Sequence, residues 1–536
     1  MHDKVEAPDT NPAMNLLTDE LITVARSGKS DRRVSLPMLL GMCVRDEIVD
    51  WPSLRPHQYP AWHMFLVQLA TLAHRSVGTD RIEGEDMWRK ALRSLAPEQD
   101  KDEPWRLVVD DWQQPAFLQP PCPIGAETEY KNTAPFADSI DMLITAKNHD
   151  LKANRIARGT PEQWLYALIS LQTTEGFLGA GNYGIARMNG GFASRPMLRC
   201  HSANLGPGAQ VVRDVQVLLR HWDRWYTEAW VGTDNDLQPL LWLLPWDGQT
   251  SLALSAFHPL AIEVCRRVRL VADGDRLLAR TVGSKVARVN AKAANGSVGC
   301  PWMPINKKGS KAFTLGADGF GYRRMVRLLD PGEYNLPLLA IPESEGEEGS
   351  RTLHLVAAGI ARGQGKTEGV HQRRILLSPR TVSRLPMGGN DETSTFVQRA
   401  KLFQEMAGIA SGKILRPALI QRIQGKTEPN WQHPANGPRT SPWTQRFDAE
   451  IDQQFFQQLD DSFANESDDD EAAREWSVFL AKTCKQVFEE ACRALPSPSE
   501  ERILAEARAW GRLRASIWKF LPLTRRQTKE ANLENT

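Results

Sequence analysis

Two short segments of this 536-residue chain carry residue types that bind phosphate. Gly363-Gln-Gly-Lys-Thr367 and Gly425-Lys-Thr427 both contain the Gly-Lys-Thr sequence with which a nucleotide-binding P-loop ends. The first glycine of the P-loop pattern would fall at Ile360 and at Ile420, so neither segment offers the full run of amides that surrounds a phosphate. The sequence therefore disfavours nucleotide hydrolysis.

A third glycine-rich segment, Gly179-Ala-Gly181-Asn-Tyr-Gly184, matches the G-x-G-x-x-G spacing of dinucleotide-binding proteins. That motif requires a strand before it and a helix after it. Leu165–Leu171 fits a helix as well as a strand, and Ile185–Gly191 does not look like a helix start. We interpret the segment as a flexible glycine-rich loop, a structure that can still serve a function other than dinucleotide binding.

The eleven histidines and seven cysteines show no metal-ligand spacing. His57 and His63 are six residues apart, His149-Asp150 stands alone, and no C-x-x-C or G-x-S-x-G sequence is present. The first dozen residues are polar and acidic. These features predict a reduced, cytoplasmic protein that is not an enzyme and holds no metal or cofactor.

The elements that must position these segments belong to an α+β fold. Periodicity predicts helices at Met38–Val44 and Trp62–Leu72, and short strands at Leu107–Val109, Val268–Val271 and Leu353–Val356. The many Gly and Pro interruptions predict a large mixed α/β domain over residues 15–390, preceded by a polar extension over residues 1–14.

The spacing of apolar residues changes after about Thr393. Apolar residues recur at helical spacing in four stretches, and Pro429–Pro442 and Pro496–Ser499 look like polar linkers between helices. The four stretches are Phe396–Ala407, Ile451–Phe463, Trp476–Leu495 and Ile503–Phe520. We therefore expect a C-terminal four-helix bundle within residues 391–536.

Charge is balanced only in the sum, with 66 Lys and Arg against 65 Asp and Glu. Asp448–Glu471 holds ten acidic residues and no basic one, whereas basic residues group in four stretches of the large domain. The basic stretches are Lys147–Arg158, Arg187–Arg199, Arg280–Lys311 and Arg351–Arg380. The segregation predicts a face of the large domain that approaches a phosphate chain, and protein contacts through the bundle.

Several short motifs resemble, in order and spacing, the CasA family of large subunits of type I-E CRISPR Cascade complexes. They cover nearly the whole chain from Asn15. They are the Asn15-Leu-Leu opening, Pro115-Ala-Phe-Leu-Gln119, Asn189-Gly-Gly-Phe192, and Gly359-Ile-Ala-Arg-Gly-Gln-Gly365 followed by Arg373-Arg374.

The resemblance implies a function in antiviral defence. A CasA protein sits on a complex that carries crRNA and inspects double-stranded DNA for a short protospacer-adjacent motif (PAM), largely from the minor groove. It then wedges the duplex open for crRNA pairing and recruits a helicase-nuclease. Minor-groove reading is degenerate, which suits a protein that accepts several related motifs.

The resemblance also implies site residues. Asn189, Gly190 and Gly191 would lay bare backbone in the groove, because a Cβ would clash there. Gln364, between Gly363 and Gly365, would enter the duplex at a hairpin tip. Lys292 or Lys285 would be the groove-reading lysine, and Lys147–Arg158 falls where the family has a loop that contacts DNA.

Two departures stand out: Arg187 replaces the first glycine of the family's loop, and the stretch around Cys265 lacks a cysteine cluster that some relatives carry and that could hold zinc. A different class of function stays open beside this one. The Gly-Lys-Thr segments and basic stretches also fit a stand-alone enzyme that processes nucleic acid or nucleotides, although the chain shows no carboxylate or histidine constellation for a catalytic metal.

Overall fold

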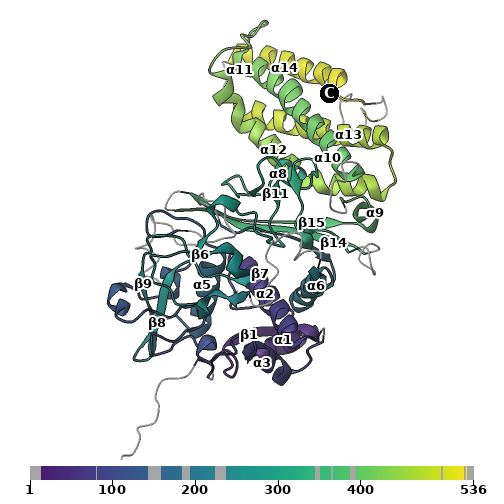
Figure 1. The fold of residues 1–536 in the computed structure, drawn as a ribbon. Coiled ribbons are helices and arrows are strands. Elements are labelled where there is room, and N and C mark those ends of the chain that lie inside the picture. The colour runs from purple at the N-terminus through teal and green to yellow at the C-terminus, as the bar shows by residue number, and fades with distance from the viewer. Residues whose placement is uncertain are drawn as a thin grey trace, which may run out of the picture. The chain divides into compact units, whose positions relative to one another are not determined.

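The computed structural model describes residues 14–79, 81–99, 101–142, 159–183, 194–223, 237–343, 351–363, 366–386, 394–495, 499–523 and 527. The chain divides into two compact units, which are treated separately here (Figure 1). The first comprises Met1–Phe320, Glu333–Glu343 and Leu355–Arg374, and the second Gly321–Gly332, Ser344–His354 and Ile375–Thr536. No helix within the described ranges has the length and apolar character to cross a membrane.

The first unit mixes helices with small sheets. Its helices are α1 (Leu36–Val44), α2 (Tyr59–Val77), α3 (Glu85–Arg93), α5 (Pro161–Thr174) and α6 (Pro207–Arg220). Its strands are β1 (Ile22–Arg26), β2 (Lys29–Val34), β3 (Asn132–Ala134), β4 (Met197–Ser202), β5 (Gln238–Leu240), β6 (Leu252–Ala253), β7 (Phe257–Ile262), β8 (Arg267–Asp273), β9 (Arg276–Val282), β10 (Val289–Asn290), β11 (Ile305–Asn306), β12 (Lys311–Ala312) and β13 (Tyr334–Asn335), together with most of β14 (Leu353–Gly363) and β15 (Lys366–Leu377).

Helix α2 forms the centre of this unit and is buried on nearly every side between α5 and α6. Trp62 on α2 packs edge-on against Trp51 and against Tyr166 of α5, with ring centroids 5.9 and 5.2 Å apart. Trp242, Trp246 and other tryptophans are likewise fully buried. Core packing therefore accounts for much of the high tryptophan content of the chain.

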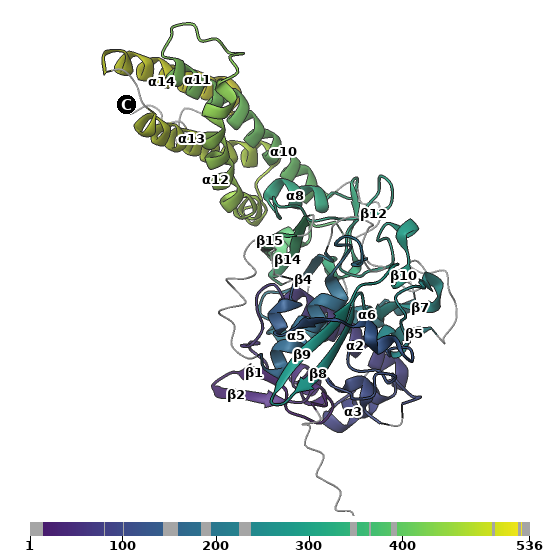
Figure 2. The ribbon, with the colours of Figure 1, turned by 90° about the vertical axis from the view of Figure 1, so that its left-hand side faces the viewer.

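The strands make several small sheets rather than one large sheet. β8 pairs with β9, which also pairs with β3, and Figure 2 shows the long β8–β9 ribbon. β14 lies between β15 and β4 in a second sheet. Both sheets bear on the candidate site, because β9 leads to Lys285 and β14 ends at Gly363.

The second unit consists of helices. They are α8 (Tyr322–Leu328), α9 (Pro379–Val382), α10 (Thr395–Ile409), the π-helical turn η10 (Ala410–Leu415), α11 (Arg416–Gln424), α12 (Asn436–Ala464), α13 (Asp469–Ala494) and α14 (Ser499–Phe520). α10, η10 and α11 run on without a break, so four long helices form the predicted bundle (Figure 1). In its core the rings of Phe403 and Trp476 stack at 4.9 Å, and the Trp476 indole donates to the Phe403 carbonyl.

The structure confirms the α+β fold class, and it changes two local predictions. Leu107–Val109 is not a strand, because its backbone is used by a side chain: Gln119 Nε2 donates to the Leu107 carbonyl at 2.9 Å. The predicted linker Pro429–Pro442 is too long, because α12 already begins at Asn436. Pro438 lies in the first turn of α12. Amides there have no hydrogen-bond acceptor within the helix, so the missing N–H of proline breaks no bond.

Candidate nucleic-acid interface

The structure describes some of the predicted site residues and not others. Asn189, Gly190, Gly191, Gln364 and Gly365 lie outside the described residues, as does Lys147–Arg158. Gly363, Lys285 and Lys292 lie inside them. The site is therefore built from the places where the predicted DNA-contacting segments leave the folded core.

The glycine segment leaves the core at the end of α5. Thr160 and Gln163 form a capping box that starts this helix, and the helix ends at Thr174. Glu175 then forms an antiparallel bridge with Ser194, and the Arg195 amide donates to the Thr174 carbonyl at 2.9 Å. The chain that leaves after Glu175 thus returns beside its point of departure at Ser194.

The first part of the glycine segment forms a turn that accepts hydrogen bonds from a buried arginine. Buried Arg266 donates from Nη2 to the Gly176 carbonyl and from Nη1 to the Tyr183 carbonyl, both at 2.7 Å. Between them, Gly179 and Gly181 have φ values of 111° and 82°, which other residues rarely adopt. The segment also follows a helix instead of a strand, so its glycines do not make a dinucleotide-binding motif.

A contact between two glycines brings Lys285 to this turn. The Ser284 amide donates to the Gly181 carbonyl at 3.0 Å, and a Cβ on Gly283 would approach the Gly181 backbone to 3.3 Å. Lys285 follows directly, with its amide bound to the Gly248 carbonyl at 2.7 Å and its side chain exposed. Its ammonium group is therefore available to an anion beside the glycine segment.

Lys292 occupies a different place. It begins the short 3-10 helix η7 (Lys292–Ala294) and is exposed. Asn295 ends that helix in the left-handed conformation, and its carbonyl accepts from the Ala312 amide of β12 at 3.0 Å. Lys292 is thus tied to the β11–β12 hairpin, whose turn exposes Lys308, rather than to the glycine turn.

The hairpin that carries Gln364 is anchored by a buried arginine that the sequence analysis did not single out. Arg362 donates from Nη2 to Glu175 Oε2 at 2.9 Å, and from Nη1 to the Met142 carbonyl at 2.7 Å and to the Thr367 hydroxyl. Thr367 Oγ1 in turn donates to the Met142 carbonyl at 2.5 Å. We call Met142, Glu175, Arg362 and Thr367 the loop-base node.

The residue before Met142 is anchored as well. Asp141 is buried, and its carboxylate binds His57 Nε2 at 2.5 Å and the Gln58 amide group at 2.7 Å. His57 thus has a structural partner. Because residues 143–158 follow Met142 in the chain, this segment too leaves from a fixed position.

Other basic residues of the predicted DNA-facing stretches turn out to be structural. Arg195, Arg199 and Arg288 are almost fully buried, and Arg288 donates to the carbonyls of Leu244 and Pro245. They cannot contact a phosphate chain, which corrects the expectation drawn from the charge pattern. A side chain of either sign is buried when enough acceptors or donors surround it, and one-dimensional charge counting does not reveal this.

Arg199 belongs to what we call the core charge cluster, made by His63 of α2, Arg199 of β4, and Gln210, Arg213 and Asp214 of α6. Asp214 binds His63 Nε2 at 2.8 Å and Arg213 Nη1 at 3.0 Å, and Arg199 Nη2 donates to Gln210 at 3.0 Å. Burial, and then the Arg199 charge, lower the pKa of His63 to about 4. The second histidine of the early pair is therefore neutral and structural.

Neither Gly-Lys-Thr segment has the surroundings of a phosphate-binding loop, which connects a strand to the start of a helix. The first runs from Gly363, the last residue of β14, to the start of the neighbouring strand β15, so a strand and not a helix follows it. The second follows the end of α11, where Gly425 caps the helix at a φ of 68°. A helix C-terminus repels anions, so this location disfavours phosphate.

Cys265, which the sequence analysis considered as part of a possible zinc site, is buried. Cys265 donates its thiol to the Leu171 carbonyl at 3.0 Å, and burial raises its pKa to about 12. Among the described residues, no group of three or more His, Cys, Asp or Glu side chains is placed to hold a metal ion.

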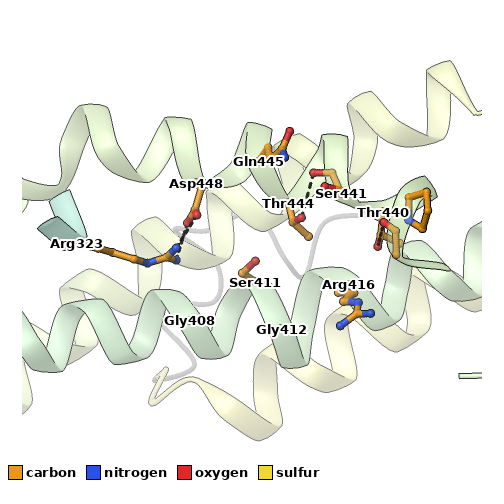
Figure 3. Close-up of a pocket in the computed structure, with 12 residues that line it drawn as sticks. Arg323, Gly408, Ser411, Gly412, Arg416, Thr440, Ser441, Thr444, Gln445 and Asp448 are labelled. Atoms are coloured by element: carbon orange, nitrogen blue, oxygen red, sulfur yellow. Dashed lines mark hydrogen bonds and ion pairs between the residues drawn. The ribbon is translucent and has the colours of Figure 1, made fainter. Parts of the chain in front are cut away.

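The acidic stretch of the second unit is partly neutralised by arginines of the same unit. Arg323 pairs with Asp448 at 2.8 Å, Arg399 with Asp469 at 2.8 Å, and Arg380 with Glu466 at 3.1 Å. The Arg323–Asp448 pair closes one end of a polar hollow of about 590 Å³ (Figure 3). The hollow exists because small residues line it. They include Gly408 of α10, Gly412 of η10 and Gly437 of α12.

Comparisons with known proteins find relatives by structure only. No protein-family model matches the chain, and no curated protein does. The solved structure of CRISPR-associated protein Cse1 from Acidimicrobium ferrooxidans is 16% identical, with a TM-score of 0.63 over 95% of this chain and 99% of that chain.

Two further structures agree. Thermus thermophilus CasA (Cse1) is 15% identical, with a TM-score of 0.62 over 94% of this chain and 99% of its own. A chain of a CRISPR RNA-guided surveillance complex is 14% identical, with a TM-score of 0.51 over 94% of this chain and 100% of its own. The resemblance seen in the sequence motifs is confirmed in three dimensions: the chain has the fold of the CRISPR-associated Cse1 (CasA) proteins.

Proposed function

We propose that this chain is the large subunit of a type I-E CRISPR Cascade complex. The observation that carries the proposal is the shared fold with Cse1 proteins over nearly the full length of both chains. The match to a chain of an RNA-guided surveillance complex supports crRNA-bearing subunits as partners. Residues 15–390 would then inspect DNA, residues 391–536 would contact other subunits, and the complex would act in the cytoplasm.

In this proposal the large domain reads the PAM from the minor groove. Asn189, Gly190 and Gly191 bring backbone to the groove floor, and Lys285 supplies the cation. Lys285 is preferred to Lys292 because its neighbour Ser284 binds Gly181 of the glycine segment. Gln364 wedges the duplex open for crRNA pairing, and the opened complex recruits a helicase-nuclease.

The competing enzyme hypothesis is weakened by local structure. It rests on the two Gly-Lys-Thr segments and on the basic stretches. The segments lie between the neighbouring strands β14 and β15 and at a helix C-terminus, and Arg195, Arg199 and Arg288 of the basic stretches are buried. We therefore propose a DNA-inspecting subunit without catalysis of its own. Turnover of ATP or plasmid by the purified protein with Mg²⁺, abolished by Lys366→Ala, would overturn this.

The central experiment uses the complex assembled with its remaining subunits and crRNA. Gln364→Ala should weaken binding to a PAM-bearing target duplex much more than to the same target with a pre-opened bubble, since only the duplex needs a wedge. Band-shift titrations measure both affinities. Equal losses on the two DNAs would contradict the wedge role.

The groove-reading residues are tested with a library of PAM sequences. Asn189→Asp should weaken binding across the library, because it places an anion in the groove. Lys285→Ala should weaken binding and its salt dependence more than Lys292→Ala, because only Lys285 lies beside the glycine turn. If Lys292→Ala has the larger effect, the assignment of the two lysines is reversed.

A further inference from the structure

Three chain segments meet at one buried guanidinium. Met142 immediately precedes residues 143–158, Glu175 opens the segment that returns at Ser194, and Arg362 and Thr367 flank Gly363–Lys366. The Arg362 side chain contacts Met142, Glu175 and Thr367 at once. These are the three segments to which the proposed function assigns DNA contacts, although they are far apart in the sequence.

The chemistry of the loop-base node suits a fixed junction. The Arg362 and Glu175 side chains are 4% and 3% exposed, so their ion pair is shielded from solvent and salt. A guanidinium presents donors in a rigid planar fork, and here the fork serves a carboxylate, a backbone carbonyl and a hydroxyl together. A lysine at the same place would carry the charge without that geometry.

A second tie joins two of these segments, the one that returns at Ser194 and the β14–β15 hairpin, independently of Arg362. The Ser194 hydroxyl donates to the Ile360 carbonyl of β14, two residues before Arg362. Ser194 is also the bridge partner of Glu175. The glycine segment is thus fastened to the hairpin strand at both its ends, once through Glu175 and once through Ser194.

From this geometry we propose that Arg362 is a positioning residue that fixes, relative to one another, the points where the three proposed DNA-contacting segments leave the core, so that PAM reading and duplex opening depend on each other. The inference rests on the proposed function. Arg362 touches no DNA in this scheme and acts through the segments that it holds. Its loss should uncouple recognition of the PAM from insertion of the wedge.

The test uses the full complex with crRNA and three DNAs: a PAM-bearing duplex, the same duplex without the PAM, and the PAM-bearing target with a pre-opened bubble. Arg362→Gln should lower the preference for the PAM-bearing over the PAM-less duplex by roughly tenfold, within the usual range of coupling between sites. Affinity for the bubble should change little, because it needs no wedge.

Arg269→Gln provides the matched control. Arg269 is also a buried arginine of the first unit, and it donates to the carbonyls of Gln119, Val109 and Asp111, away from the node. It should lower thermal stability without lowering PAM preference. An equal loss of PAM preference in Arg269→Gln, or an equal loss on duplex and bubble in Arg362→Gln, would overturn the inference.

Two further variants guard against simple misfolding. Glu175→Gln combined with Arg362→Gln leaves no unpaired buried charge, and Thr367→Val removes the hydroxyl that contacts Arg362 and the Met142 carbonyl while keeping the ion pair. Both should fold. The double variant should lose PAM preference as Arg362→Gln does, and wild-type preference in it would refute the inference. Thr367→Val should lose less, because Arg362 still joins the three segments, and a loss as large as that of Arg362→Gln would assign the positioning role to the hydroxyl instead. If the wild-type complex itself shows no PAM preference, it is the proposed function that fails.

Discussion

Two of the buried arginine centres in the first unit have nearly the same chemistry and different attachments. In the core charge cluster, Arg199 and Asp214 are 1% and 0% exposed, and in the loop-base node Arg362 and Glu175 are 4% and 3% exposed. The cluster connects α2, β4 and α6, all regular elements held by further packing. The node connects the end of one strand to places where chain segments leave the core.

The effect of a buried ion pair therefore depends on the elements to which it is attached. Inside packed elements, a charge cluster mainly affects whether the unit folds, since its partners stay where the helices put them. At the ends of segments, the same pair decides where those segments start. We therefore expect large changes in stability and none in DNA preference from the cluster, and smaller changes in stability with altered DNA preference from the node.

The largest effect should come from Asp214→Ala. It leaves Arg199 and Arg213 buried without their carboxylate, and breaking a buried pair in this way costs about 3–5 kcal/mol. Chemical denaturation followed by tryptophan fluorescence measures the loss. Asp275→Ala, which removes an exposed carboxylate 3.9 Å from Arg276, is the control and should cost at most about 1 kcal/mol. Similar losses in both variants would mean that the cluster carries no special weight.

The second effect is a pH dependence that belongs to the cluster alone. Burial and the Arg199 charge lower the pKa of His63 from 6.5 to about 4. Between pH 6.5 and about pH 4, His63 is therefore protonated in the unfolded chain and neutral in the folded protein. Stability should therefore fall by up to roughly 3 kcal/mol as the pH drops from about 6.5 to 4.

The His63→Gln variant should lose this slope, whereas His433→Gln, which changes an exposed histidine, should keep it. Asp214 contributes in a lower range. Burial opposes its ionisation, but Arg199, His63 and Arg213 together hold its pKa below 3.8, so its share disappears only under more acidic conditions. Denaturation curves at several pH values separate the two. An unchanged slope in His63→Gln would assign the dependence to other groups.

The third effect concerns the node and should be local. Glu175→Gln keeps a hydrogen-bond acceptor beside Arg362 but leaves its buried charge without a carboxylate, at a cost of about 3 kcal/mol, the lower end for a broken buried pair. The Arg195 amide, which donates to the Thr174 carbonyl next door, should exchange its hydrogen faster, while amides within α2 should not. Mass spectrometry of the exchanged peptides tests this. Faster exchange throughout α2 would show that the node stabilises the whole unit, like the cluster.

The sequence predicted the helices of the bundle, because helical periodicity is a local signal. It did not predict the node. In the sequence, Glu175 resembles any polar residue at the end of a helix, and Arg362 is one of several basic residues in its stretch. The two residues meet only because β14 pairs with β4 and β15. The same limit explains why Arg195, Arg199 and Arg288 were counted as surface cations. Their burial depends on carbonyls and carboxylates from distant segments.

The smallest effect is predicted for Ser194→Ala, which separates the two ties between the glycine segment and the hairpin. It removes the hydroxyl that donates to the Ile360 carbonyl and leaves Arg362 and Glu175 in place, so its cost should be about 1 kcal/mol. PAM preference should fall less than in Arg362→Gln, because the arginine still joins all three segments. Ser202→Ala, whose hydroxyl donates to Asn204 at 2.7 Å, is the control for loss of a similar bond elsewhere in the unit. If Ser194→Ala abolishes PAM preference, the serine tie and not the guanidinium is what holds the segments together.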